Sequence, residues 1–215
     1  MKPLTALLLL ACTLAAGARA AELTVTAKTG KGEAVPDAVV SLVPLDDIQP
    51  LPAPAAGPAQ EIVQQNQEFS PFVTVVQAGA TVRFPNRDTV QHHVYSLSKA
   101  KKFELPLYNP GAEESFVFDV PGVVTLGCNI HDWMLAYLVV VPTPWFAKCD
   151  AAGAARVTAP AGRYRLTVWH PRLAAPLAEE ITLAHGAPLR REFVLTLKPD
   201  RRIRRGPEGK NSGYR

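Results

Sequence analysis

The chain has 215 residues, of which 47% are apolar and 20% are charged. This composition supplies a hydrophobic core and excludes disorder as the general state of the chain. Twenty prolines against fourteen glycines argue against long helices and favour short strands joined by turns. The formal net charge is +4, but residues 198–215 carry seven Lys/Arg against two Asp/Glu, so the body of the chain is mildly acidic. Nucleic-acid binding by that body is therefore not expected.

The first twenty residues have the pattern of a secretory signal peptide. Lys2 precedes an apolar run over 4–16, and Ala18-Arg19-Ala20 supplies the small residues of a cleavage site. The run is shorter than the roughly 20 residues of a membrane-spanning helix, and no later uncharged stretch reaches that length. We therefore expect residues 1–20 to be removed on export to the periplasm. Cys12 allows a second interpretation, a lipoprotein box, although the apolar run before it is short for one.

From residue 23 onward the pattern is that of an all-β protein. Alternation over 23–27 and an apolar run over 38–43 predict an N-terminal β-hairpin, which a Pro-rich loop over 46–60 follows. Short strands at near-regular spacing then predict a β-sandwich or barrel. Six candidate strands, separated by Gly, Pro and Asn turn signals, cover residues 72–76, 80–84, 90–96, 115–120, 123–128 and 135–141.

A second, smaller β-sandwich is predicted after Pro144. Polar and apolar residues alternate over 163–168, and similar patterns recur at 181–183 and 193–197. This unit has about 55 residues, near the lower limit for independent folding, so we expect it to pack on the first domain or to borrow the N-terminal hairpin. Residues 200–215 lack periodicity and predict a disordered basic tail.

The residues with the most informative chemistry lie in one short loop. Cys128, His131 and Met134 form Cys-x-x-His-x-x-Met between two apolar strands, which places a thiolate, an imidazole and a thioether in one turn. His92 and His93, on an upstream strand, can supply a second imidazole. Two histidines, a cysteine and a weak axial methionine are the ligands of a type-1 copper site, which transfers electrons. An apolar wall around such a site excludes water and tunes its potential.

The same residues leave other interpretations open. Cys128, His131 and both upstream histidines could hold zinc, although Met134 would then have no role. The same soft ligands could hold Cu(I) for delivery or storage without turnover. Exported proteins favour disulfides, so a metal-free scaffold with a Cys128–Cys149 bond is a further possibility. No motif for a nucleophilic triad, a phosphate loop or paired acid–base carboxylates occurs, which favours a carrier over an enzyme.

Residues 69–141 resemble the cupredoxins. Val82-Arg83-Phe84-Pro85-Asn86, followed by His92-His93-Val94, looks like the Val-x-Phe-x-Asn and His-Asn-Val patterns of plastocyanin and amicyanin. The loop that begins at Cys128 has the short spacing of amicyanin. The resemblance implies a Greek-key β-sandwich that binds one type-1 copper per chain. Its implied ligands are His92, Cys128, His131 and Met134.

The upstream ligand is one of two neighbouring histidines. His93 occupies the position where the smaller cupredoxins usually have an asparagine that connects the two ligand loops. The resemblance therefore favours His92, because it precedes the residue that matches this asparagine. It also implies that Asn86 hydrogen-bonds near the ligands and that His131, at the solvent edge, is where electrons leave the metal.

The layout of the whole chain is similar to exported proteins called methylamine-utilisation proteins. In these, a cupredoxin domain precedes a carboxypeptidase-regulatory-like β-sandwich of immunoglobulin or prealbumin type, which residues 146–150 and 161–171 resemble. The resemblance implies a cupredoxin domain over 21–142, including the N-terminal hairpin, and a second domain over 143–199. Likeness to amicyanin implies redox partners, with a quinoprotein amine dehydrogenase as donor and a c-type cytochrome as acceptor. The sequence does not indicate which oligomeric state the protein adopts.

Overall fold

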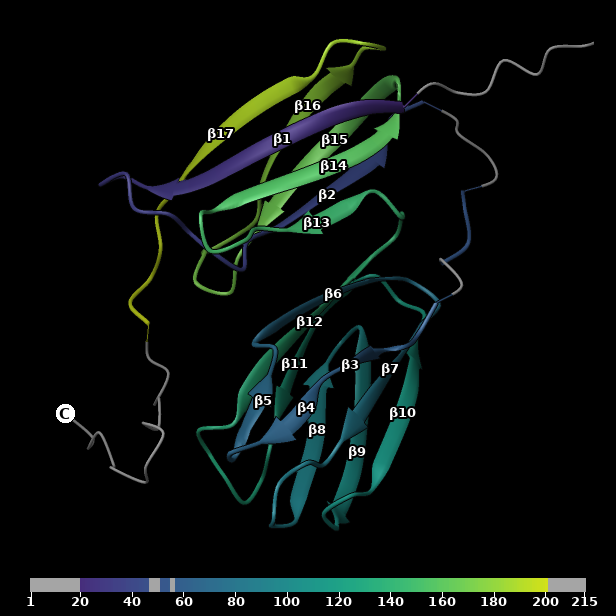
Figure 1. Cartoon of the computed structure of the whole chain (residues 1–215), viewed down its shortest axis with the longest axis vertical. Coiled ribbons are helices and arrows are strands. Elements are labelled where there is room, and N and C mark those ends of the chain that lie inside the picture. The colour runs from purple at the N-terminus through teal and green to yellow at the C-terminus, as the bar shows by residue number, and fades with distance from the viewer. Residues whose placement is uncertain (1–19, 47–50, 55–56, 201–215) are drawn as a thin grey trace, which may run out of the picture.

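The computed structural model describes residues 20–46, 51–54 and 57–200. Within these ranges every regular element is a strand, and no helix is long and apolar enough to cross a membrane. Figure 1 shows two β-sandwiches stacked along the long axis of the molecule. We call residues 60–141 the central sandwich, and the unit that combines both ends of the chain the terminal sandwich. The predicted all-β fold with two sandwiches is confirmed.

The central sandwich consists of a three-stranded sheet in the order β10-β7-β3, a five-stranded sheet in the order β6-β12-β11-β8-β9, and the β4–β5 hairpin. Most neighbours in these sheets are not consecutive in the chain, as in a Greek key. Phe84, Phe118 and Leu126 fill the core between the sheets. The strands are β3 (Gln60–Glu61), β4 (Val63–Gln65), β5 (Glu68–Ser70), β6 (Val73–Gln77), β7 (Ala80–Pro85), β8 (His92–Ser98), β9 (Lys101–Tyr108), β10 (Glu113–Phe118), β11 (Gly122–Gly127) and β12 (Leu135–Val141).

The terminal sandwich has sheets in the orders β14-β1-β17 and β13-β2-β15-β16. Its core contains fully buried side chains from both sheets, among them Leu23, Leu42 and Tyr164. The strands are β1 (Ala20–Thr29), β2 (Val39–Pro44), β13 (Phe146–Lys148), β14 (Ala154–Pro160), β15 (Gly162–Trp169), β16 (Leu177–Leu183) and β17 (Leu189–Leu195).

The N-terminal strands belong to the terminal sandwich, so their predicted place in a domain over 21–142 is wrong. β1 runs antiparallel to β14 and parallel to β17, and it is the middle strand of its sheet. β2 lies between β13 and β15 in the other sheet, so β1 and β2 do not form the predicted hairpin. Alternation over 23–27 shows that one face of the strand is buried, but it does not identify the sheet that the strand joins. The alternative expectation, that the small second unit borrows the N-terminal strands, agrees with this pairing.

The six strands predicted for the central sandwich correspond to β6, β7, β8, β10, β11 and β12, with ends that differ by a few residues. β9 was not predicted, and it contains Pro106 and three charged residues. β9 is the last strand of its sheet and pairs only with β8. An edge strand tolerates proline and charged side chains because one of its sides needs no partner. Residues 1–19 of the predicted signal peptide, parts of the Pro-rich loop and most of the predicted tail lie outside the described residues.

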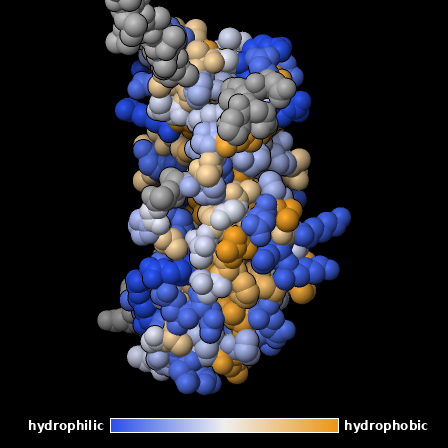
Figure 2. Space-filling model, turned by 90° about the vertical axis from the view of Figure 1, so that its right-hand side faces the viewer, coloured by the Kyte–Doolittle hydropathy of each residue, from blue (hydrophilic) through white to orange (hydrophobic). Residues whose placement is uncertain are grey.

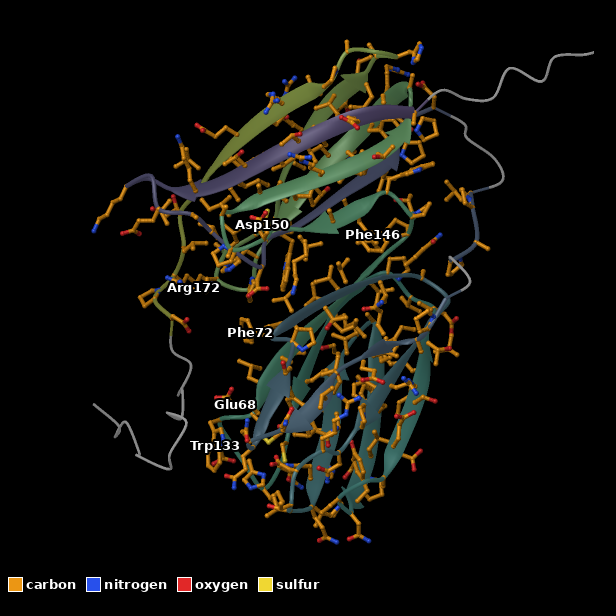
Figure 3. The ribbon with its side chains drawn as sticks, viewed as in Figure 1. Glu68, Phe72, Trp133, Phe146, Asp150 and Arg172 are labelled. Atoms are coloured by element: carbon orange, nitrogen blue, oxygen red, sulfur yellow. The ribbon has the colours of Figure 1, made fainter. Side chains whose placement is uncertain are left out.

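The two sandwiches meet through an apolar interface. Val73, Val139 and Val141 on β6 and β12 pack against Val39 on β2. The Tyr137 ring meets the Trp169 ring edge to face, with centroids 5.7 Å apart. Lys148 Nζ donates to the Val73 carbonyl at 2.9 Å. Figure 3 shows Phe72 and Phe146 facing this junction from opposite sides. The interface covers the outer face of β6 and β12 and leaves the far end of the central sandwich open.

The surface of the described residues is mostly hydrophilic, with hydrophobic patches on the lower half of the molecule (Figure 2). That half is the central sandwich. It carries most of the exposed large hydrophobic residues: Val90, Leu97, Leu107, Val117, Val120 and Ile130.

Cys128 and Cys149 are free thiols in the cores of different sandwiches, so the predicted alternative of a Cys128–Cys149 disulfide is wrong. Burial raises the pKa of the Cys149 thiol to about 12, and the nearby carboxylates of Asp150 and Asp37 add to the effect. The folded protein therefore favours the neutral thiol.

We expect iodoacetamide at pH 9 to leave Cys149 unmodified in the native protein and to modify it after denaturation in urea. Because the unfolded thiol ionises near its ordinary pKa and the folded thiol only near 12, the free energy of unfolding should fall as the pH rises between these values. Cys149→Ser should weaken this dependence. Peptide mass spectrometry and urea titrations measure both effects, and rapid alkylation of the native thiol would contradict them.

We also expect Leu23→Ala to lower the free energy of unfolding by about 3 kcal/mol, because it opens a cavity in the core of the terminal sandwich. Leu23 is fully buried in β1, whereas neighbouring Glu22 is exposed, so Glu22→Ala is a matched control with little effect. Urea titration measures both variants. Equal losses in the two would show that β1 is not packed as described.

Candidate metal centre

The 128–134 loop connects two paired strands. β11 and β12 are antiparallel neighbours, and their last pair is Gly127 with Leu135. Residues 128–134 therefore form a loop whose two ends are held together by the sheet. Inside it, Met134 N–H donates to the His131 carbonyl at 2.9 Å, which closes a tight turn. The loop presents Cys128, His131 and Met134 from a fixed base.

His92 begins β8, where the pairing with β9 is irregular. His92 pairs with Tyr108 and Val94 with Leu105, so a register shift falls between them. A bulge of this kind re-aims side chains and is frequent beside functional sites. As a result His92, His93 and Val94 are all buried, although strict alternation would turn one of them to solvent. For this reason, alternation in the sequence could not show which of the two histidines joins the loop residues.

The structure brings three of the predicted ligands together. One donor atom from each of His92, Cys128 and His131 lies within 4.8 Å of the other two. Cys128 Sγ is 3.6 Å from His131 Nδ1, and the rings of His92 and His131 have centroids 4.9 Å apart. No other such cluster occurs among the residues that the structure describes. Met134, the fourth predicted ligand, is 2% exposed and packs in the same core as Cys128.

One nitrogen of the His92 ring is hydrogen-bonded, and the other has no hydrogen-bond partner. Nε2 lies 2.7 Å from Asp88 Oδ2, and since a carboxylate accepts, Nε2 carries the hydrogen. Nδ1 therefore has a lone pair, yet it is buried and has no hydrogen-bond partner. A buried polar atom without a partner is costly unless something binds it. An imidazole lone pair near a thiolate and a second imidazole suits a soft transition metal, so the residues fit copper.

His93 does not join the cluster. Its Nε2 lies 2.8 Å from Glu104 Oε1, and its ring centroid is 5.5 Å from that of Tyr95. These residues line a groove of about 780 Å³ that also borders Cys128. The zinc interpretation required both upstream histidines, and the structure does not assemble that set. The structure thus groups His92, and not His93, with the loop ligands.

Asn86 organises the segment that leads to His92. Its side-chain amide donates to the carbonyls of Val90 and Tyr108, and its Oδ1 accepts from Asp88 N–H at 3.0 Å. This places Asp88 beside the His92 ring. Burial raises the pKa of Tyr108, whose hydroxyl donates to the Phe84 carbonyl at 2.8 Å. Asn86 was expected near the ligands from the resemblance, whereas Asp88 was not predicted. The only sequence signal of Asp88 is its position four residues before His92.

The centre lies near the surface on one side. His92 and Cys128 are buried, while His131 is partly exposed and its neighbour Ile130 is 48% exposed. The Trp133 ring lies beside His131, with centroids 5.2 Å apart, and packs against the core of the central sandwich. His131 is therefore the member of the cluster that reaches solvent.

No protein-family model and no curated protein matches the chain. Among solved structures, a purple cupredoxin from Nitrosopumilus maritimus is 26% identical, with a TM-score of 0.35, over 38% of this chain and 99% of its own. A mutant of amicyanin in its reduced Cu(I) form is 22% identical, with a TM-score of 0.37, over 41% of this chain and 92% of its own. A Cu-containing nitrite reductase from Thermus scotoductus is 23% identical, with a TM-score of 0.38, over 46% of this chain and 27% of its own.

The central sandwich has the arrangement that the cupredoxin resemblance of residues 69–141 implies. Its two sheets carry the histidine–cysteine–histidine cluster at one end, with the ligand loop between β11 and β12. The clustering of His92 with Cys128 and His131 distinguishes this centre, because the Nδ1 of buried His93 also lacks a hydrogen-bond partner.

We expect His92→Gln to abolish tight copper binding and His93→Gln to retain it, since only His92 belongs to the cluster. The two substitutions make the same chemical change at adjacent buried positions, so each controls for the other. Titration of the metal-free protein with Cu(II), followed by metal analysis after gel filtration, measures the effect. Loss of copper from the His93 variant alone would reverse the assignment.

Proposed function

We propose that the protein is a type-1 copper protein that carries single electrons in the periplasm and is not an enzyme. The observation that carries the proposal is the cluster of His92, Cys128 and His131, in which buried His92 has an Nδ1 without a hydrogen-bond partner. Copper, when bound, supplies the exchange of one electron between its Cu(I) and Cu(II) states. The signal-peptide pattern over residues 1–20 supports export.

The protein's own residues hold the donor atoms in place. The pairing of Gly127 with Leu135 fixes both ends of the ligand loop, and Asp88 fixes the orientation of the His92 ring. Cys128 and Met134 are almost completely buried, so water is kept from the sulfur donors. A site that is already formed rearranges little when its charge changes, and this favours fast electron transfer.

Electrons would enter and leave through the exposed edge of the centre. His131 is the partly exposed cluster residue, and the exposed side chain of Ile130 directly precedes it in the chain. Val90, also exposed, lies two residues before His92. An apolar surface around a redox centre suits a short-lived contact with another protein. By likeness to amicyanin, we propose a quinoprotein amine dehydrogenase as the donor and a c-type cytochrome as the acceptor, as in methylamine utilisation.

The purified protein should develop an intense thiolate-to-copper absorption band in the visible range on addition of Cu(II), and ascorbate should bleach it. The band arises from a short Cu(II)–thiolate bond, so it reports directly on Cys128. A protein that binds Cu(I) tightly but stays colourless with Cu(II) would indicate copper delivery or storage and would contradict the electron-transfer proposal.

Cys128→Ser should remove the absorption band, whereas Cys149→Ser should leave its position and intensity unchanged. Both cysteines are buried and free, but only Cys128 lies in the histidine cluster. Absorption spectra of the two copper-loaded variants at equal protein concentration provide the measurement. Equal loss of colour in both variants would show that the thiolate assignment is wrong.

A further inference from the structure

A two-residue turn lies between the two ligand segments. The β4–β5 hairpin closes at Asn66-Gln67, whose φ angles are 56° and 57°. Two-residue hairpin loops use this left-handed region at both positions, usually with Asn-Gly, because glycine adopts it without steric cost. Gln67 has a side chain in that position, so other contacts must maintain the conformation. Strain of this kind gathers at functional sites.

Asp88 binds the turn from one side. Its Oδ1 accepts from Asn66 N–H at 2.9 Å, and its Oδ2 accepts from Gln67 N–H at 2.7 Å. The same Oδ2 lies 2.7 Å from His92 Nε2. The Asp88 side chain is only 11% exposed, so these charge-assisted bonds are little weakened by water. One carboxylate therefore connects the turn to the upstream ligand.

Trp133 binds the turn from the other side. Its Nε1 donates to the Gln67 carbonyl at 2.9 Å, and its ring lies beside His131. Figure 3 shows Trp133 next to Glu68, the residue that follows the turn. Gln67 is thus bonded through its N–H to Asp88 and through its carbonyl to Trp133. A continuous chain of contacts runs from His92 to His131.

We propose that Asp88 and Trp133 are positioning residues that hold His92 and His131 at a fixed separation through the Asn66-Gln67 turn. In the cupredoxins that the sequence resembles, an asparagine at the position of His93 connects the two ligand loops. Here His93 is bonded to Glu104, and the bridge through the turn makes that connection. Asp88 also keeps the hydrogen on His92 Nε2 and so leaves Nδ1 as the donor atom. The effect on copper rests on the proposed function, whereas the bridge itself is a property of the metal-free protein.

Hydrogen exchange on the metal-free protein tests the bridge without copper. The amides of residues 66 and 67 should be protected, and Asp88→Asn should speed their exchange by about 10-fold, since each loses a bond to a carboxylate. Trp133→Phe keeps an aromatic ring beside His131 but removes the donor to Gln67, and it should speed exchange in the same turn. Unprotected turn amides in the folded wild-type protein would overturn the proposal.

Copper affinity tests the consequence for the metal. Asp88→Asn should weaken Cu(II) binding by about 10- to 100-fold, the usual effect of losing a partner of a ligand histidine. The matched control is Glu104→Gln, which makes the same change at the carboxylate 2.8 Å from His93 and should alter affinity by at most about twofold. Competition titrations of both copper states give the affinities. Equal effects of the two substitutions would overturn the proposal.

A double variant tests whether Asp88 and Trp133 act as one unit. If the turn connects them, the loss of Cu(II) affinity in Asp88→Asn/Trp133→Phe is smaller than the product of the two single losses. Independent, fully multiplicative losses would overturn the bridge. A folded protein with protected turn amides that binds no copper would remove the proposed function and keep the bridge. A copper-binding protein in which Asp88→Asn and Glu104→Gln have the same effect would keep the proposed function and overturn the bridge.

Discussion

A buried imidazole that lies beside a cysteine and a second imidazole is the feature on which the proposed metal centre depends. Asp88 accepts the hydrogen of His92 Nε2, and this leaves the other ring nitrogen without a partner in the protein interior. Such an arrangement destabilises the metal-free fold slightly and stabilises any state in which Nδ1 binds a cation. The bond from Asp88 N–H to Asn86, and the turn at residues 66–67 that binds the Asp88 carboxylate, help to maintain this arrangement.

The rest of the central sandwich supplies rigidity from several directions. The ligand loop is anchored in the middle of a five-stranded sheet, and the outer face of β6 and β12 is buried against the terminal sandwich. The ligands are therefore held by strands that cannot shift independently. The same packing leaves the far end of the sandwich accessible, which is where the partly exposed His131 lies.

The sequence was most informative where chemistry and structure are local. Cys128, His131 and Met134 fall within one loop, so their spacing alone indicated a metal site, and short alternating runs indicated strands. Apart from the grouping of His92 with the loop, which the cupredoxin resemblance implied, contacts between distant segments were not predictable. Nothing in a single sequence connects Asp88 with residues 66–67, and the bulge that distinguishes His92 from His93 has no pattern of its own. β1 was assigned to the wrong sandwich because alternation identifies a buried face and not its partner.

The placement of β1 also constrains the order of assembly. It is synthesised before the whole central sandwich, yet its neighbours β14 and β17 both follow residue 150. A chain that is synthesised from its N-terminus exposes the apolar face of β1 until almost all of the protein has emerged. The central sandwich, whose strands and core all lie within residues 60–141, can fold during that interval. The terminal sandwich then closes last, and the late pairing of β1 is the step at which aggregation competes with folding.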